Sequence, residues 1–143
     1  MNVRLTMQAL LLPALVVAAV GCGASGPSPP DVVRAWAKAL RADDNERAAS
    51  LFARNAVVVQ GDRLIYLRTH ADAVAWNARL PCSGVIVSLT QEGSATTAVF
   101  QLGDRKSRPC GDPPGAEAIA LFVVEHGKIV LWDQIGSQLA VGH

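Results

Sequence analysis

Beyond the first 30 residues, the most apolar pattern lies near the C-terminus, where two runs rich in Val, Ile, Leu, Phe and Trp flank a short polar turn. The runs span residues 118–135, and the turn between them occupies residues 125–128. β-Branched and aromatic residues on both sides of a Gly-containing turn predict a β-hairpin, with Gly127 at positive φ. Because the runs are too apolar for a solvated ribbon, we expect this hairpin at the centre of a sheet, covered on much of both faces by upstream elements.

Helical patterns precede the hairpin. Asp31 follows two prolines and is a candidate N-cap, and apolar residues from Val33 to Leu40 then recur at helical spacing. The polar turn at residues 43–45 ends this helix and can cap a second one, whose apolar stripe ends at Phe52. We expect these two helices to form a helical hairpin.

A third helix is predicted between Thr69 and Pro81. Thr69 and Asp72 have the spacing of a capping box, and Pro81 stops the helix after about three turns. Four shorter strand patterns lie around it, at residues 56–59, 63–67, 85–90 and 96–102. Residues 103–115 combine charge with Gly and Pro, and a loop of this length in a compact domain is uncommon unless it is functional or tied down.

Composition is typical of a single globular domain. The 143 residues are 50% hydrophobic and 17% charged, which is enough for one sizeable core. The formal net charge of +1 gives no overall electrostatic footprint for nucleic acid or an anionic membrane. We therefore exclude nucleic acid as a partner and expect membrane contact only through a lipid anchor.

The first 21 residues have the parts of a secretory signal peptide. Arg4 precedes an apolar run at residues 9–20 that is too short to span a bilayer, and small residues follow it. Residues 19–22 resemble the lipobox of bacterial lipoproteins, in which the peptide is cut before a lipidated cysteine, here Cys22. We expect an exported protein anchored to the cell membrane by lipid; the alternative is a secreted protein cut near residues 17–19.

The sequence thus divides into four segments. A stretch rich in Gly, Ser and Pro after the cleavage site is typical of a flexible tether, and the last residues are expected to fray. The predicted organisation is a signal peptide (1–21), a tether (22–30), a folded domain (31–136) and a C-terminal tail (137–143).

Three cysteines are an odd number for an exported chain. If Cys22 carries lipid, Cys82 and Cys110 remain as a pair in turn-like contexts, and an oxidising compartment favours a disulfide between them. Two free thiols are the alternative. Neither cysteine has a ligand-type neighbour at short spacing, so no metal site is predicted.

The order of the predicted elements resembles a known superfamily. Two helices, a strand pair, a helix and four antiparallel strands ending in a long hairpin are similar to the nuclear transport factor 2-like superfamily, which includes ketosteroid isomerases and SnoaL-like polyketide cyclases. The resemblance spans residues 31–135 and is carried by residues 32–36, 43–44, 48–59 and 122–129 and by Trp132. It implies an α+β fold: a cone-shaped, curved antiparallel sheet wrapped around N-terminal helices, with a mostly apolar cavity at the wide end.

The catalytic positions of the related enzymes are changed in this chain. In the alignment with steroid isomerases, Trp36 occupies the position of their tyrosine hydrogen-bond donor. Gln60 occupies the position of their aspartate base, and Ile119 that of their protonated aspartic acid. An amide cannot abstract a proton and an isoleucine cannot stabilise an oxyanion, so that mechanism is not available. Limonene-epoxide-hydrolase relatives carry an aspartate at the position of Gln134; Asp133 is one residue away and would face the opposite side of a strand.

No other catalytic signature stands out. The chain has no GxSxG, HExxH or phosphate-binding loop, and no cofactor is predicted. His70 begins the third helix and could serve as an acid or base at the cavity mouth, but a solvated or capping histidine is the commoner case. His126, in the hairpin turn, and His143, at the C-terminus, do not look catalytic.

Large aromatic and amide side chains are best placed to line the cavity. The ligand-pocket candidates are Trp36, Phe52, Gln60, Tyr66, Trp76, Trp132 and Gln134. Gln101 and Glu117 are further polar candidates, although half of such strand residues are expected to face outward. We expect a protein that binds a small apolar ligand or a partner protein. A divergent isomerase, dehydratase or cyclase is one alternative, and a structural module that pairs through its sheet, as in a homodimer, is another.

Overall fold

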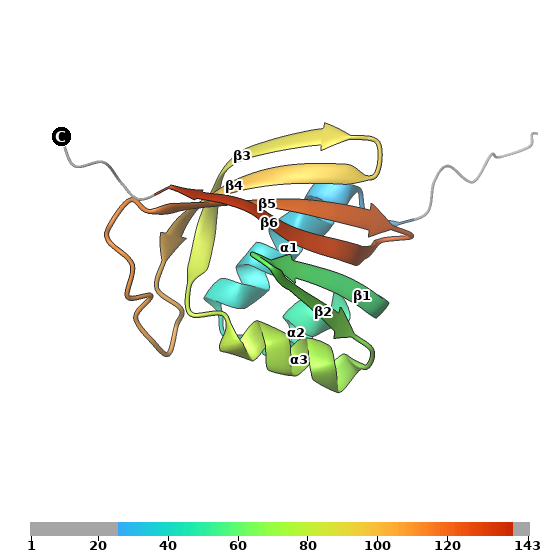
Figure 1. Ribbon diagram of the computed structural model, residues 1–143, viewed down its shortest axis with the longest axis horizontal. Coiled ribbons are helices and arrows are strands. Elements are labelled where there is room, and N and C mark those ends of the chain that lie inside the picture. Colours follow the sequence, from blue (N-terminus) through green and yellow to red (C-terminus); the bar gives the residue numbers. More distant parts are fainter. Residues whose placement is uncertain (1–25, 139–143) are drawn as a thin grey trace, which may run out of the picture.

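The computed structural model describes residues 26–138, which form three helices and six strands. In chain order they are α1 (Pro29–Arg41), α2 (Asn45–Ser50), β1 (Phe52–Gln60), β2 (Arg63–Leu67), α3 (His70–Arg79), β3 (Ser83–Glu92), β4 (Ala95–Gly103), β5 (Glu117–Glu125) and β6 (Lys128–Gln138). The strands make one curved, open sheet, and all three helices lie on one side of it (Figure 1). The predicted α+β fold class is confirmed.

The start of the first helix differs from the prediction by a few residues. Ser28, not Asp31, is the N-cap, and its hydroxyl oxygen accepts a hydrogen bond from the Asp31 backbone N–H at 3.3 Å. Pro29 and Pro30 occupy the first helical positions, where a missing N–H costs nothing. The helix therefore begins inside the segment that the sequence assigned to the tether.

The second helix is shorter than predicted. Asp44 caps it as expected, but it ends at Ser50, and Phe52 already belongs to β1. Sheet pairing overrides the helical stripe here, because Ile129 of β6 donates a backbone hydrogen bond to Leu51 O at 2.8 Å and lies opposite Phe52 in the ladder. The third helix has the predicted capping box between Thr69 and Asp72.

The hairpin of β5 and β6 occupies the centre of the sheet, as predicted. The strand order is β2-β1-β6-β5-β4-β3, and β1 pairs with β6 in parallel while the other neighbours are antiparallel. His126 and Gly127 both have positive φ, at 50° and 73°, which suits a tight two-residue turn. β6 continues to Gln138, past the predicted end of the hairpin at Ile135.

Only one face of this central hairpin is covered, so the expectation of cover on both faces is wrong. On β5, Ala120, Phe122 and Val124 are buried, whereas the alternate residues Leu121 and Val123 are partly exposed. The helices pack on the first set, which we call the inner face. α1 contacts β3, β4 and β5, and α2 and α3 pack against each other beside β1 and β2 (Figure 1).

No helix in the described part of the chain is long and apolar enough to cross a membrane. The predicted signal peptide, Cys22 and His143 lie outside the residues that the structure describes.

Candidate functional site

A cavity of about 210 Å³ lies between α1 and the inner face of the sheet. Most of its wall is apolar and comes from α1, the turn after α3 and the strands of the sheet. The lining residues are Trp36, Ala37, Leu40, Gln60, Leu80, Pro81, Cys82, Ser83, Gly84, Phe100, Leu102, Asp112, Ala118, Ala120, Trp132 and Gln134. A concave, largely apolar site with a few polar groups is the usual form of a small-molecule pocket.

Trp36 of α1 is fixed at the centre of the aromatic wall. Its ring packs edge-on against Phe100 and Phe122, with centroids 5.9 and 5.4 Å away. Its Nε1–H donates to Oδ1 of Asn77, a fully buried α3 residue, at 2.8 Å. This bond joins α1 to α3 and fixes the orientation of the indole.

Two amides supply the polar part of the wall. Gln60 at the end of β1 lies opposite Gln134 of β6 in the parallel ladder, and both line the cavity. The Oε1 of Gln60 accepts a hydrogen bond from Nε1 of Trp76 at 3.2 Å. This orients the amide, whose NH₂ group and second oxygen lone pair can still bind another molecule.

The structure brings four of the seven pocket candidates together in this wall: Trp36, Gln60, Trp132 and Gln134. Phe52 and Trp76 are buried and pack on each other with centroids 5.5 Å apart, but neither lines the cavity. Tyr66 does not belong to the site. It lies opposite Val57 in the β1–β2 ladder, on the uncovered face of the sheet, where half of its surface is exposed.

Other sequence candidates also lie on the uncovered face. Asp133 lies opposite Leu121 in the β5–β6 ladder, between the cavity-lining residues Trp132 and Gln134. It therefore faces the other side of the sheet, as the strand alternation predicted. Glu117 and Gln101 lie opposite each other in the β4–β5 ladder, and neither lines the cavity. Ile119 alternates with the lining residues Ala118 and Ala120, so the position aligned with the isomerase aspartic acid points away from the cavity in this chain.

His70 is placed away from the cavity. It is exposed at the start of α3, and its Nε2 lies 2.7 Å from Glu46 Oε2. With Phe52 it borders a second hollow of about 260 Å³, separate from this cavity. The proposed role as an acid or base at the cavity mouth is therefore not supported by its position.

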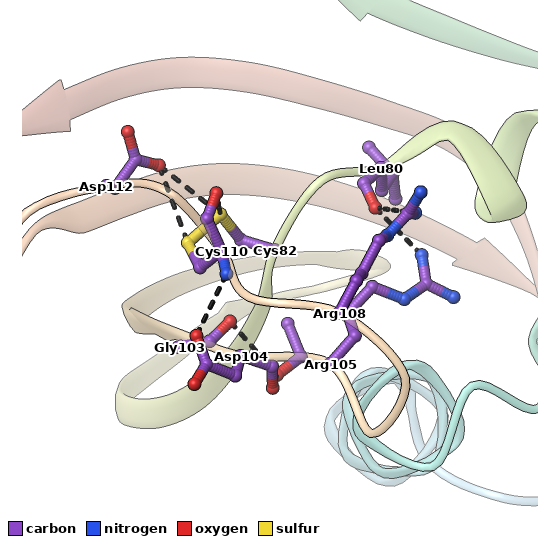
Figure 2. Close-up of a disulfide and its surroundings, with 9 residues drawn as sticks. Leu80, Cys82, Gly103, Asp104, Arg105, Arg108, Cys110 and Asp112 are labelled. Atoms are coloured by element: carbon purple, nitrogen blue, oxygen red, sulfur yellow. Dashed lines mark hydrogen bonds between the residues drawn. A yellow bond between two sulfur atoms is a disulfide. The ribbon is translucent and has the colours of Figure 1, made fainter.

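Cys82 and Cys110 form the predicted disulfide, with their Cα atoms 4.4 Å apart (Figure 2). It joins the start of β3 to the loop of residues 104–116. Asp104 reinforces the joint, since its Oδ1 accepts from Cys110 N at 2.9 Å and its carbonyl oxygen accepts from the Ser83 hydroxyl at 2.6 Å. Cys82 and Ser83 line the cavity, so the disulfide helps to hold one wall in place.

Asp112 is the one ionisable residue among those that line the cavity. Its Oδ2 lies 3.3 Å from Cys82 Sγ and 3.6 Å from Cys110 Sγ (Figure 2). The sulfurs are bonded to each other and carry no proton, so these contacts are not hydrogen bonds. The three residues are also the group of possible metal ligands in the described part of the chain, but disulfide sulfurs offer no thiolate to a metal.

A buried arginine ties the same loop to the helices, and sequence reasoning missed it. Arg105 is 3% exposed, its Nε lies 2.7 Å from Asp43 Oδ1, and it donates to the carbonyl oxygens of Asn77 and Leu80. Hydrogen bonds from Ser107 and Arg105 hold the pKa of the Asp43 carboxyl below its usual value. In the sequence, Arg105 stands in a charged, Gly- and Pro-rich stretch that gives no sign of burial.

Comparison with known proteins identifies the fold alone. No protein-family description matches the sequence, and no curated protein matches it. Among solved structures, the chain is similar to an NTF2-like protein of unknown function from Cytophaga hutchinsonii, with 13% identity, a TM-score of 0.59 and coverage of 74% of this chain and 87% of the other.

Two further similar structures carry the names of enzymes. A putative ketosteroid isomerase from Kribbella flavida is 17% identical, with a TM-score of 0.63 and coverage of 80% of this chain and 81% of the other. An LEH-like epoxide hydrolase from M. tuberculosis is 17% identical, with a TM-score of 0.57 and coverage of 73% and 83%. The fold is thus NTF2-like, and it carries more than one activity.

Proposed function

We propose that this chain, which has an NTF2-like fold, is an exported single-domain protein that binds a small apolar ligand in the cavity beneath α1. The observation that carries the proposal is the cavity itself, about 210 Å³ in volume, with aromatic side chains in its wall and two amides at one side. Apolar walls favour binding by removing apolar ligand surface from water, and the amides can orient the ligand.

Binding is favoured over catalysis by the chemistry of the wall. Gln60 and Gln134 stand where related enzymes carry carboxylates, and an amide cannot take a proton. Asp112 is the one carboxylate in the lining, and it sits on an exposed loop beside the disulfide. A divergent isomerase, dehydratase or cyclase is the alternative, and in such an enzyme Asp112 would be the residue available as the base.

Filling the cavity tests the binding proposal. Ala118 lines the cavity, whereas its neighbour Ile119 faces the other side of the sheet. Ala118→Phe should abolish binding of a hydrophobic probe such as ethylbenzene, measured by the probe-induced rise in melting temperature, and Ile119→Phe should preserve it. Equal binding by both variants would show that the probe does not occupy this cavity.

An isomerase assay separates binding from catalysis. With a Δ5-3-ketosteroid as substrate, the wild-type protein should show no turnover because Gln60 has no basic group. Substantial wild-type turnover would contradict the proposal. Turnover in Gln60→Asp alone would show that the cavity accepts the steroid and lacks only the base.

A second function, pairing with another copy of this chain, is favoured by the uncovered face of the sheet. This outer face carries exposed apolar side chains on both edge strands. Leu64 and Tyr66 on β2 and Val85 on β3 are about half exposed. Large exposed apolar patches mark interaction sites, and a two-fold contact would cover the same patch on both copies.

We also propose that the protein is anchored by lipid at Cys22, with secretion into the medium as the alternative. The proposal rests on the signal-like residues 1–21 and the small residues that precede Cys22. The disulfide is consistent with an oxidising compartment. Cys22→Ser should release the protein from the membrane fraction; a wild-type protein already free in the medium with an N-terminus elsewhere would contradict the anchor.

A further inference from the structure

Apart from the cavity, a larger groove lies between α1 and the edge strand β3. It has a volume of about 550 Å³ and is formed by one face of α1 and by residues 85–89 of β3. Its α1 side carries Arg34, Lys38 and Arg41. Its β3 side carries Val85 and Val87, each 53% exposed. The groove therefore places three cations next to exposed apolar side chains.

The three bases of the groove share one face of α1. Lys38 comes four residues after Arg34, and Arg41 three residues after Lys38, which is the spacing of neighbours on a helix surface. Arg34 Nη1 lies 3.6 Å from Asp31 Oδ1, but Lys38 and Arg41 form no ion pair with any residue that the structure describes. Since the whole chain has a formal net charge of only +1, this is a local excess of positive charge that an anionic partner can neutralise.

The β3 side of the groove is an open edge of the sheet (Figure 1). In the described part of the chain β3 pairs only with β4, so one side of its backbone offers N–H and C=O groups to another strand. β3 contains no Lys, Arg or Pro, and a bulge between Ile86 and Ser88 is its one protective feature. The opposite edge strand, β2, is half as long and carries Arg63. β3 is thus the edge better suited to receive a further strand.

The dimensions of the groove match those of a short strand. The bases from Arg34 to Arg41 span about 10 Å along α1, and residues 85–89 span about 13 Å along β3. A strand added beside β3 presents alternate side chains toward α1 at intervals of about 6.6 Å, close to the intervals of about 4.5–6 Å between the bases. The side chains between them face the outer side of the sheet, where Val85 lies opposite Gln101.

We propose that the groove binds an extended segment of a partner protein in which acidic and apolar residues alternate, and that this segment pairs with β3 as an additional strand. Its carboxylates lie beside Arg34, Lys38 and Arg41, and its apolar side chains lie beside Val85. Main-chain hydrogen bonds to β3 supply affinity, and the bases select the sequence. This binding site is independent of the cavity and of the ligand proposed for it.

Two other occupants match the groove less well. An anionic lipid can neutralise the bases, but its acyl chain has no donors or acceptors for the backbone of β3. A second copy of β3 brings a single carboxylate, that of Glu92 at its last position, so edge-to-edge pairing leaves most of the bases without partners. An extended segment with alternating acids satisfies both sides of the groove.

Two peptides of identical composition test the alternation. An acetylated, amidated heptapeptide of alternating Val and Glu should bind about 10-fold more tightly than a peptide with all its Val residues first and its Glu residues last, because each exposed ion pair contributes a few-fold in affinity. Fluorescence anisotropy of labelled peptides measures both affinities. In a ¹H–¹⁵N spectrum of the wild-type protein, the alternating peptide should shift the backbone amides of residues 85–89 and leave those of residues 63–67 unchanged.

A charge reversal and its matched control locate the site. Lys38→Glu with Arg41→Glu should weaken binding of the alternating Val/Glu peptide by at least about 10-fold and should create binding of an alternating Val/Lys peptide. Arg63→Glu with Arg68→Glu makes the same change of charge at the opposite edge of the sheet and should do neither. All four side chains are exposed, so both variants should fold like the wild type.

The other outcomes would overturn the proposal in distinguishable ways. Equal binding of the alternating and block peptides would show that no strand pairs with β3. Binding to phosphatidylglycerol vesicles but to neither peptide would make the groove a lipid contact. A wild-type dimer that binds no peptide and dissociates in Lys38→Glu/Arg41→Glu would assign the groove to a second copy of the chain. Peptide binding should persist in Ala118→Phe, because Ala118 lines the cavity and not the groove, so this inference and the cavity proposal can fail separately.

Discussion

The inner and outer faces of the sheet are built from the same six strands, but helices cover only the inner face. On β5, Phe122 is fully buried beneath α1, while the adjacent Leu121 points to the other side and remains partly exposed. Both faces carry Val, Leu and Ile, but Phe100, Phe122 and Trp132 lie on the inner face, and Gln101, Glu117 and Asp133 lie on the outer one. The difference arises because α1, α2 and α3 all pack on one side. An apolar strand thus predicts a sheet, but not which of its faces the helices cover.

The largest loss of stability is expected from truncating Phe122 on the inner face, and its neighbour Leu121 on the outer face is the comparison. Phe122→Ala should lower the free energy of unfolding by about 3–5 kcal/mol, because it leaves a cavity among Trp36, Phe100 and Trp132. Leu121→Ala should cost about 1 kcal/mol, since its side chain is already partly in water. Urea unfolding at low protein concentration measures both. Similar losses would mean that the outer face is as well packed as the inner one.

Removing the disulfide should give the next largest loss of stability. Cys82 lines the cavity on the inner face of the sheet. Cys82 and Cys110 are 28 residues apart, and opening a loop of this length should cost about 3–4 kcal/mol in the chain-entropy model. Unfolding of the double variant Cys82→Ser/Cys110→Ser, compared with the wild type, measures this cost. Because Cys82 lines the cavity, the variant should also bind ethylbenzene more weakly. Unchanged stability would show that Arg105 and its hydrogen bonds hold the loop without the disulfide.

The smallest effect on folding is expected on the outer face. Leu64→Lys with Val85→Lys should change the free energy of unfolding by less than about 1 kcal/mol, because both side chains are about half exposed. If the outer face pairs two copies, the same variant should remain monomeric at concentrations where the wild type is a dimer, as measured by light scattering. Asp62→Lys, in the exposed β1–β2 turn, adds charge away from the face and should leave the dimer intact. A monomeric wild-type protein would contradict the pairing.

Local patterns in the sequence determined much of the fold. The hairpin turn with Gly127, the capping box of Thr69 and Asp72 and the central apolar runs all act through neighbours in the chain, so they can be identified without coordinates. The disulfide was also predictable, by elimination from three cysteines in a chain whose first residues predict export.

The remaining features depend on strand register and on contacts between distant segments, so only the tertiary structure decided them. Tyr66 and Gln60 looked equally suitable for the cavity, but strand phase turned one outward and the other inward, since a shift of one residue exchanges the faces of a strand. Arg105 is buried because Asp43, some sixty residues earlier, and the carbonyl oxygens at the end of α3 converge on it. The groove beside β3 likewise exists only in the folded chain, because it joins Lys38 of α1 to Val85 of β3 and no local pattern brings these two elements together.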